Sequence, residues 1–159
     1  MKLWLLRHAH AELQHPSGRD LDRRLDPAGR SACHQLQDWM RELPEGRPQQ
    51  VLVSPAQRTQ ETATFALAHL DFPPAVIEPR LWNATAGDLL DLIQTQQPAA
   101  QALLLIGHNP GLEDLLRWLT GRFLPSGMKP GMLVVLNLSP PLQPGCGRME
   151  HIFQPKASI

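Results

Sequence analysis

Basic side chains stand just beyond the ends of three short apolar runs of this chain. They are Arg7 and His8 after the run at 3–6, Arg58 after the run at 51–53, and His108 after the run at 102–106. A guanidinium presents a planar set of N–H donors to phosphate oxygens, and a neutral imidazole offers one nucleophilic nitrogen. Two arginines and two histidines brought together would therefore suit phosphoryl transfer.

The elements that must bring these residues together can be read from the three runs. Each run is continuously apolar and short, which is typical of strands buried on both faces of a sheet. Residues that start helices follow two of the runs, and we expect Ser54 and Asn109 to be N-caps with Pro55 and Pro110 in the first helical positions. Free N–H groups at these helix starts would favour a bound anion.

Further helices and a strand complete the predicted sheet. Asp26 and Pro27 predict the start of a helix that continues with apolar spacing to Leu43, and we also expect a helix over about 86–96 and a strand over 132–138. Strands alternating with helices predict an α/β fold in three layers, with a mostly parallel central sheet flanked by helices. Ligands of such sheets bind beyond the carboxyl ends of the strands, where the basic residues stand.

Composition limits the class of partner. The 159 residues predict a single domain over 1–159, and the equal numbers of acidic and basic residues leave no net charge to attract nucleic acid or an anionic membrane. Two cysteines outside any paired motif favour a reducing compartment, and no apolar stretch approaches a membrane span or a signal peptide. We expect a cytoplasmic protein that is a monomer or a weak oligomer.

Four ordered motifs resemble those of the histidine phosphatase superfamily. Arg7-His8-Ala9 resembles its Arg-His-Gly signature, and the segment DLDRRLDPAGR at 20–30 resembles the Asp-x-Asp-Arg-x-Leu-x-x-x-Gly motif of the SixA-type phosphohistidine phosphatases. The segments SPAQRTQETA at 54–63 and GHNPGLEDLL at 107–116 match two further family motifs. The resemblance runs nearly end to end and implies a phosphoglycerate mutase-like fold.

The resemblance also implies roles for individual residues. His8 would be the nucleophile that becomes phosphorylated, while Arg7, Arg58 and His108 would bind the phosphoryl oxygens, with no metal and no cofactor. Gln14 and Asn109 would be further substrate-binding residues. From the residues themselves we expect the neighbouring arginines to lower the pKa of His8 below about 6.5. An acceptor such as a backbone carbonyl would have to fix its tautomer.

The leaving group indicates the substrate. Many superfamily members carry a carboxylic acid in the block that corresponds to PRLWNATAGD at 79–88, and Asn83 cannot donate a proton in its place. A phosphoramidate nitrogen can be protonated from solvent, so the expected reaction is hydrolysis of phosphohistidine in a phosphorylated protein. The candidate proton donors that remain are Glu12, Glu61, Asp88 and His10. With one of them, the alternative is a phosphomonoesterase acting on a small metabolite or sugar phosphate.

Two further interpretations compete with these two enzyme hypotheses. A metal-dependent hydrolase would use His8, His10 and His108 as ligands, and a non-catalytic module would bind a phosphorylated partner without turnover. For the neighbours of the site, we expect Asp22 and Arg23 to form a structural ion pair. Trp4, Trp39 and Trp118 would then belong to the core, and Trp82 could line the pocket rim.

Overall fold

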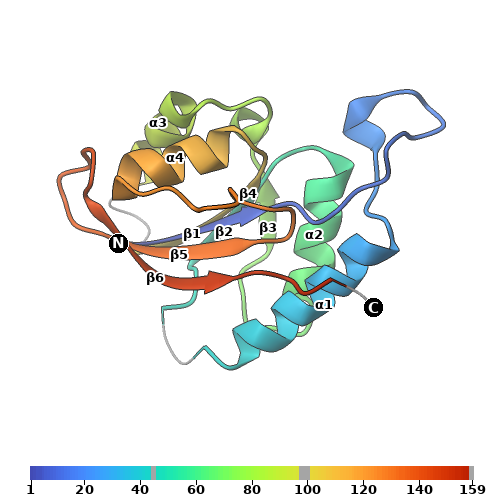
Figure 1. Cartoon of the computed structure of the whole chain (residues 1–159), viewed down its shortest axis with the longest axis horizontal. Coiled ribbons are helices and arrows are strands. Elements are labelled where there is room, and N and C mark those ends of the chain that lie inside the picture. The colour runs from blue at the N-terminus through green and yellow to red at the C-terminus, as the bar shows by residue number, and fades with distance from the viewer. Residues whose placement is uncertain (44–45, 97–100, 158–159) are drawn as a thin grey trace.

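The apolar runs assemble into one sheet in the computed structural model, which describes residues 1–43, 46–96 and 101–157 (Figure 1). The strands in these ranges are β1 (Lys2–Arg7), β2 (Gln50–Val53), β3 (Ala75–Ile77), β4 (Ala102–Gly107), β5 (Leu133–Leu138) and β6 (Gly147–Phe153). The helices are α1 (Pro27–Arg41), α2 (Gln57–Leu67), α3 (Ala86–Gln96) and α4 (Gly111–Thr120), with 3-10 turns η1 (Asp20–Asp22) and η2 (Pro79–Leu81).

The six strands have the order β3-β2-β4-β1-β5-β6. Strands β3, β2, β4 and β1 pair in parallel, whereas β5 is antiparallel to both β1 and β6. Only β5 therefore runs against the others among the described strands. The mostly parallel α/β sheet that the sequence predicts is confirmed.

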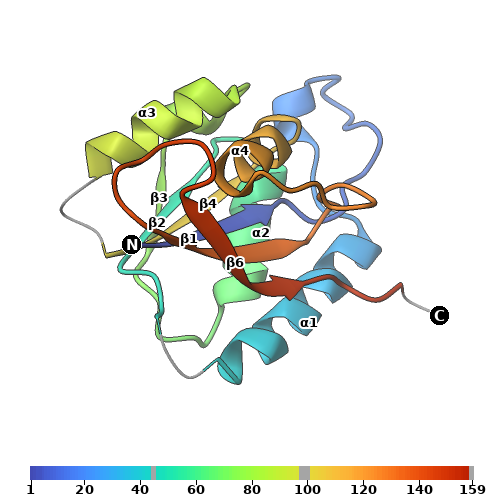
Figure 2. The ribbon, with the colours of Figure 1, turned by 60° about the vertical axis from the view of Figure 1, so that its left-hand side comes forward.

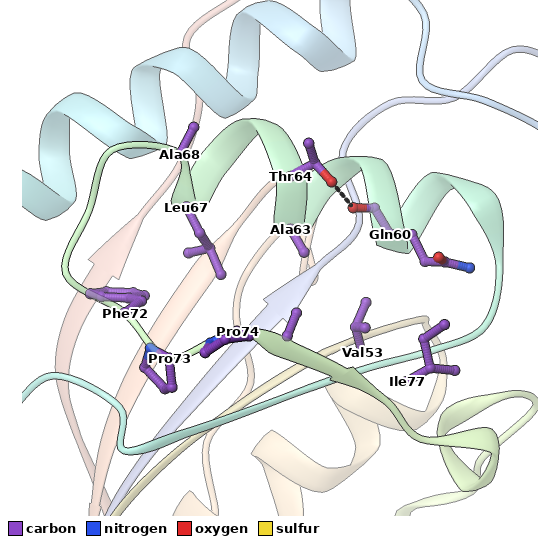
Figure 3. Close-up of a pocket in the computed structure, with 11 residues that line it drawn as sticks. Val53, Gln60, Ala63, Thr64, Leu67, Ala68, Phe72, Pro73, Pro74 and Ile77 are labelled. Carbon is purple, nitrogen blue, oxygen red and sulfur yellow. Dashed lines mark hydrogen bonds between the residues drawn. The ribbon is translucent and has the colours of Figure 1, made fainter.

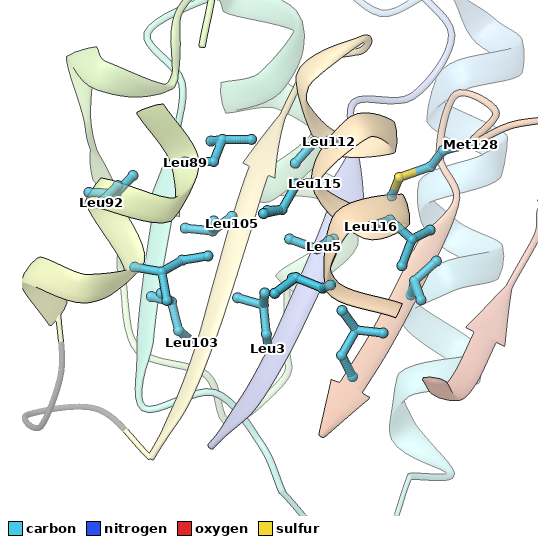
Figure 4. Close-up of a cluster of buried hydrophobic side chains, with 14 of the residues drawn as sticks. Leu3, Leu5, Leu89, Leu92, Leu103, Leu105, Leu112, Leu115, Leu116 and Met128 are labelled. Carbon is cyan, nitrogen blue, oxygen red and sulfur yellow. The ribbon is translucent and has the colours of Figure 1, made fainter. Parts of the chain in front are cut away.

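Helices cover both faces of the sheet (Figures 1 and 2). Leu3 and Leu5 of β1 belong to the core cluster that includes residues of α3 and α4, and Figure 4 shows them on the face of the sheet that carries these two helices. Trp4 and Leu6, the alternate residues of the same strand, belong to the cluster beneath α1 and α2. Each fully buried leucine contributes about 2 kcal/mol relative to an exposed one. Because β1 has side chains buried in two cores, its end is held on both sides.

The helix starts agree with the sequence in one case and differ in two. Asp26 caps α1, because its carboxylate accepts the N–H of Gly29 at 2.8 Å. Helix α2 instead begins at Gln57 after Ala56, without a side-chain cap, and α4 begins at Gly111 after Pro110. The prediction that Ser54 and Asn109 are N-caps is wrong: the Ser54 hydroxyl contacts His108, and Asn109 is turned so that its Nδ2 donates to Met128 while its buried Oδ1 has no partner among the described residues.

The ion pair predicted between Asp22 and Arg23 is also wrong. Arg23 donates from Nη1 to Asp20 at 2.8 Å, whereas Asp22 lies 3.7 Å from Arg19. The 3-10 turn η1 places the side chains at 20 and 23 on the same side, three residues apart. Asp20 thereby becomes the acidic residue that braces this loop.

The predicted core tryptophans separate into two groups. Trp4 is fully buried in the sheet, while Trp39 and Trp118 are partly buried and pack against the edges of the two clusters.

Candidate active site

Parallel pairing brings three strand ends to one edge of the sheet. Arg7 lies opposite Gly107 in the pairing of β1 with β4, and the backbone N–H of His8 donates to the Gly107 carbonyl at 3.1 Å. On the other side of β4, the N–H of Ser54 donates to Ile106 at 3.1 Å. The residues that follow β1, β2 and β4 therefore meet, as the sequence predicts.

His8 has one ring nitrogen fixed and the other free for chemistry. Its Nδ1 lies 2.8 Å from the backbone carbonyl of Ala9, which can only accept, so we assign the proton to Nδ1. The Nε2 lone pair is then available as a nucleophile. The Ala9 N–H in turn donates to Thr62 on α2 at 3.0 Å, which holds this turn of the backbone in place. The expected carbonyl acceptor is thus the residue next to His8.

Both histidines of the site are neutral near physiological pH. Burial is the main cause that lowers the pKa of His8 to about 3, and the nearby His108, Arg58 and Arg7 contribute to this value against the raising effect of the Ala9 carbonyl. Burial and then Arg58 lower the pKa of His108 to about 4. The predicted lowering of the His8 pKa is confirmed, but burial contributes more to it than the arginines do. A neutral imidazole is the nucleophilic form.

His108 lies beside His8, with ring centroids 5.3 Å apart. Its Nε2 is 2.8 Å from the hydroxyl of Ser54, which is completely buried. The edge of the His108 ring also meets the ring of Trp82 at 5.3 Å between centroids. Ser54 and Trp82 therefore fix the orientation of the second histidine. The contact with Trp82 agrees with the position at the pocket rim suggested from the sequence.

Arg58 is buried at the start of α2, with only 6% of its surface exposed. Its Nη1 donates to the backbone carbonyl of Asp20 at 2.9 Å, and its Nη2 donates to the Asp20 carboxylate at 3.1 Å. The guanidinium carbon lies 5.6 Å from the centroid of the Trp82 ring. Within the described chain the buried Nε of Arg58 has no hydrogen-bond partner. This N–H is available to an anion.

Arg7 approaches the site from the end of β1. Its Nη1 donates to the carbonyl of Met128 at 2.8 Å, in the loop before β5. Its Nε is buried and, among the described residues, has no acceptor. Two arginines thus leave buried N–H groups unsatisfied around two neutral histidines, and a buried unsatisfied donor is costly unless a ligand completes it.

The two remaining predicted binding residues differ in position. Asn109 donates from Nδ2 to the Met128 carbonyl at 2.8 Å and to Glu113 at 3.2 Å, so it ties the start of α4 to the same loop as Arg7. Gln14 is exposed and lines a cavity of about 320 Å³ beside Asp20. Their assignment as phosphate ligands stays a prediction.

The candidate proton donors are occupied in structural contacts. The Glu12 carboxylate accepts the N–H of Arg24 at 3.0 Å, and the Glu61 carboxylate accepts the N–H of Leu25 at 3.0 Å. Asp88 accepts the N–H of Thr85 at the start of α3. The hydrogen bond from Arg23, together with Arg58, holds the pKa of Asp20 below its ordinary value, so this carboxylate stays ionised and is a poor acid.

The three imidazoles of the metal interpretation do not come together. His10 is directed to the carboxylate of Asp26, at the start of α1, and its side chain is 60% exposed. His8 and His108 have no third partner of this kind, because the described residues contain no group of three or more His, Cys, Asp or Glu side chains suited to a metal ion.

A cavity of about 400 Å³ lies away from these residues, between α2 and β3 (Figure 3). Leu67 on α2 points toward Pro74 across it. Its lining is largely apolar and includes none of the basic residues described above. The candidate site at the carboxyl ends of the strands is therefore separate from this cavity.

A sheet edge that gathers two arginines and two neutral histidines is suited to binding a tetrahedral oxyanion such as a phosphoryl group. The comparison with known families makes the assignment specific. The chain belongs to the histidine phosphatase superfamily, branch 1, whose family model matches residues 3–115.

Solved structures confirm the SixA-type resemblance. A candidate phosphohistidine phosphatase SixA from Agrobacterium tumefaciens is 31% identical, with a TM-score of 0.80 over 97% of this chain and 98% of that chain. The protein histidine phosphatase SixA complexed with tungstate is 23% identical, with a TM-score of 0.80 over 98% and 97% of the two chains. A candidate alpha-ribazole-5'-P phosphatase from Escherichia coli shares the fold at 15% identity, with a TM-score of 0.73 over all of both chains.

An uncharacterized chloroplastic protein of Arabidopsis thaliana is 32% identical over 130 residues. The match takes in 76% of this chain but only 59% of the length of that curated relative. None of the described helices is both long enough and apolar enough to cross a bilayer.

Proposed function

We propose that this protein is a phosphatase that hydrolyses phosphohistidine in proteins, without a metal, through a covalent intermediate on His8. The observation that carries the proposal is the state of His8. Its Nδ1–H is held by the Ala9 carbonyl, and its pKa of about 3 keeps Nε2 unprotonated. A nucleophile in this form needs no base to activate it.

The first step is transfer of the phosphoryl group to the enzyme. The Nε2 lone pair of His8 forms a bond to phosphorus as the P–N bond of the substrate breaks, and the leaving imidazole takes its proton from solvent. The buried N–H groups of Arg7 and Arg58, together with His108, would stabilise the charge on the three phosphoryl oxygens. Such positioning and charge stabilisation account for most catalysis of this reaction.

The second step restores the enzyme. Water attacks the phosphorus of phospho-His8, the bond between phosphorus and Nε2 breaks, and inorganic phosphate leaves with the site as it began. Electrons and atoms balance without a redox partner.

The substrate class follows from the acids near the site. The family resemblance implies that Asn83 stands in the block where many relatives carry a proton donor, and the carboxylates named above are hydrogen-bonded elsewhere or held ionised. An alcohol leaving group without an acid would react about 10²- to 10⁴-fold more slowly. Phosphohistidine avoids this loss, because its nitrogen can take a proton from water. The SixA similarity supports the same substrate class.

The test compares a phosphohistidine peptide, a phosphoserine peptide and an aryl phosphate on one preparation. The proposal predicts kcat/KM for phosphohistidine at least about 10²-fold above that for phosphoserine. Equal turnover of the two peptides would instead favour a phosphomonoesterase, and a stable complex without phosphate release would make the protein a binding module. The His8→Ala variant should fold and release no phosphate.

A further inference from the structure

We propose that Asp20 is a positioning residue for the phosphoryl site, which orients Arg58 so that its Nε edge faces the bound oxyanion. This inference rests on the proposed function and adds to it a residue that does not touch the substrate.

Asp20 binds Arg58 through two different groups. Its backbone carbonyl accepts from Nη1 at 2.9 Å, and its carboxylate accepts from Nη2 at 3.1 Å. Two contacts from one residue fix both the direction and the rotation of the planar guanidinium, which a single contact would leave free to pivot. Arg58 is 6% exposed, whereas the Asp20 side chain is 53% exposed, so water reaches the pair only from the side of the carboxylate.

The remaining donors of Arg58 lie on the neighbouring edge. A guanidinium has five N–H bonds, and Nε–H lies parallel to one hydrogen of a terminal nitrogen. This pair is the second fork of the group, and its Nε–H is buried without a partner in the described chain. Asp20 thus occupies the terminal fork and leaves the fork that includes Nε to the anion.

Asp20 is itself held in place by the loop that contains it. Arg23 donates from Nη1 to the other carboxylate oxygen of Asp20 at 2.8 Å, and donates from Nε to the carbonyl of Glu12 at 2.8 Å. Both oxygens of the carboxylate are therefore engaged by different arginines. The ring of Trp82, 5.6 Å from the Arg58 carbon, limits motion out of the guanidinium plane.

The opposite role for Asp20 is also testable. If its carboxylate competed with the phosphoryl group for Arg58, removal of Asp20 would strengthen anion binding. Separate forks for Asp20 and for the anion predict the reverse, because an Arg58 held only by the backbone carbonyl of residue 20 can pivot and must lose that freedom on binding.

The experiment measures tungstate affinity by calorimetry for the wild type, Asp20→Ala, Asp20→Asn and the matched control Asp22→Ala. Asp22 lies on the same 3-10 turn, and its contacts are with Ser17 and Arg19 rather than with Arg58. The unfolding temperature of each variant is measured alongside. Tungstate is a tetrahedral oxyanion, so its binding reports the site without any need for turnover.

We expect Asp20→Ala to weaken tungstate binding about tenfold at an unfolding temperature close to that of Asp22→Ala, while Asp22→Ala stays within about twofold of the wild type. Asp20→Asn, which keeps an oxygen acceptor, should recover part of the loss. Affinity within twofold of the control, or above the wild type, in both Asp20 variants would overturn the inference. If Asp20→Ala does not fold, Asp20→Asn decides alone, with about threefold weaker binding expected and no loss refuting it.

Failure of this inference is distinct from failure of the proposed function. The proposed function fails if the wild type does not hydrolyse the phosphohistidine peptide, whatever the tungstate affinities are. The role of Asp20 is refuted if replacing Asp20 leaves the tungstate affinity unchanged, whatever the substrate is.

Discussion

Acidification should lower the free energy of unfolding, in part because His8 takes up a proton more readily in the unfolded chain than in the folded protein. Replacing His8 by Gln should remove this contribution to the loss of stability. The pKa of His8 is about 3 in the folded protein, against about 6.5 for an unfolded chain. Between these values the unfolded state binds the proton and the folded state does not. The stability that His8 contributes as a neutral group is therefore complete above about pH 6.5 and is lost as the pH falls toward 3.

The size of this effect follows from the two pKa values. At pH 5 the linkage relation gives a loss of about 2 kcal/mol for His8, an order-of-magnitude figure that is a large fraction of the stability of a small protein. His108, with a pKa of about 4, contributes in the same direction. Because the rings are 5.3 Å apart, the two titrations are coupled, and only a comparison of variants separates them.

Urea denaturation at pH 7 and pH 5 measures the effect. Between these pH values the wild type should lose about 2 kcal/mol more than His8→Gln, with equal m-values in both proteins. His34→Gln is the matched control, since this histidine is exposed on α1. Equal losses in the wild type and His8→Gln would refute the claim that His8 is held neutral in the fold.

Three other changes test separate parts of the structure. Ser54→Ala should lower kcat/KM about tenfold, because it removes the 2.8 Å contact that orients His108, and unchanged steady-state kinetics would show that the hydroxyl has no such role. Gly111→Ala places a methyl group 2.2 Å from the Ala84 carbonyl and should lower the free energy of unfolding, measured by urea denaturation, by at least about 2 kcal/mol. Its control is Gly87→Ala, whose methyl group would lie 3.7 Å from the nearest atom and should cost no stability. A larger loss in Gly87→Ala than in Gly111→Ala would contradict this packing. A strong chelator should leave phosphohistidine turnover unchanged, and activity that is lost and then restored by a metal salt would revive the metal interpretation.

The buried strands could be predicted because burial on both faces leaves a clear pattern. The runs at 3–6, 51–53 and 102–106 became β1, β2 and β4, and the helix over 86–96 has the predicted bounds. Strands β3 and β6 gave no such signal. All three residues of β3 are exposed, and β6, at the opposite edge of the sheet, mixes polar and apolar residues without a regular alternation and buries only Phe153. Edge strands of this kind are determined by pairing with a neighbouring strand more than by a pattern in their own residues.

The candidate site shows where sequence patterns stop being informative. A parallel sheet dictates that Arg7, His8 and His108 meet, so their convergence could be predicted. The local cap preference of Ser54 was the wrong guide, because its buried hydroxyl lies 2.8 Å from His108 Nε2, whereas its contact with a backbone N–H, that of Ala56, is 3.5 Å long. Spacing alone could not show that Asp20, rather than Asp22, faces Arg58, since both acids flank the same turn.

The most direct test of the account is detection of phosphate on His8. Wild-type protein is mixed with excess phosphohistidine peptide, quenched in alkali within milliseconds and analysed by mass spectrometry. A covalent mechanism through His8 predicts an acid-labile phosphoryl group on the peptide that contains His8, and no such group in folded His8→Ala protein, which also releases no phosphate. Turnover by His8→Ala, or rapid hydrolysis by the wild type with phosphate trapped on another residue, would contradict it.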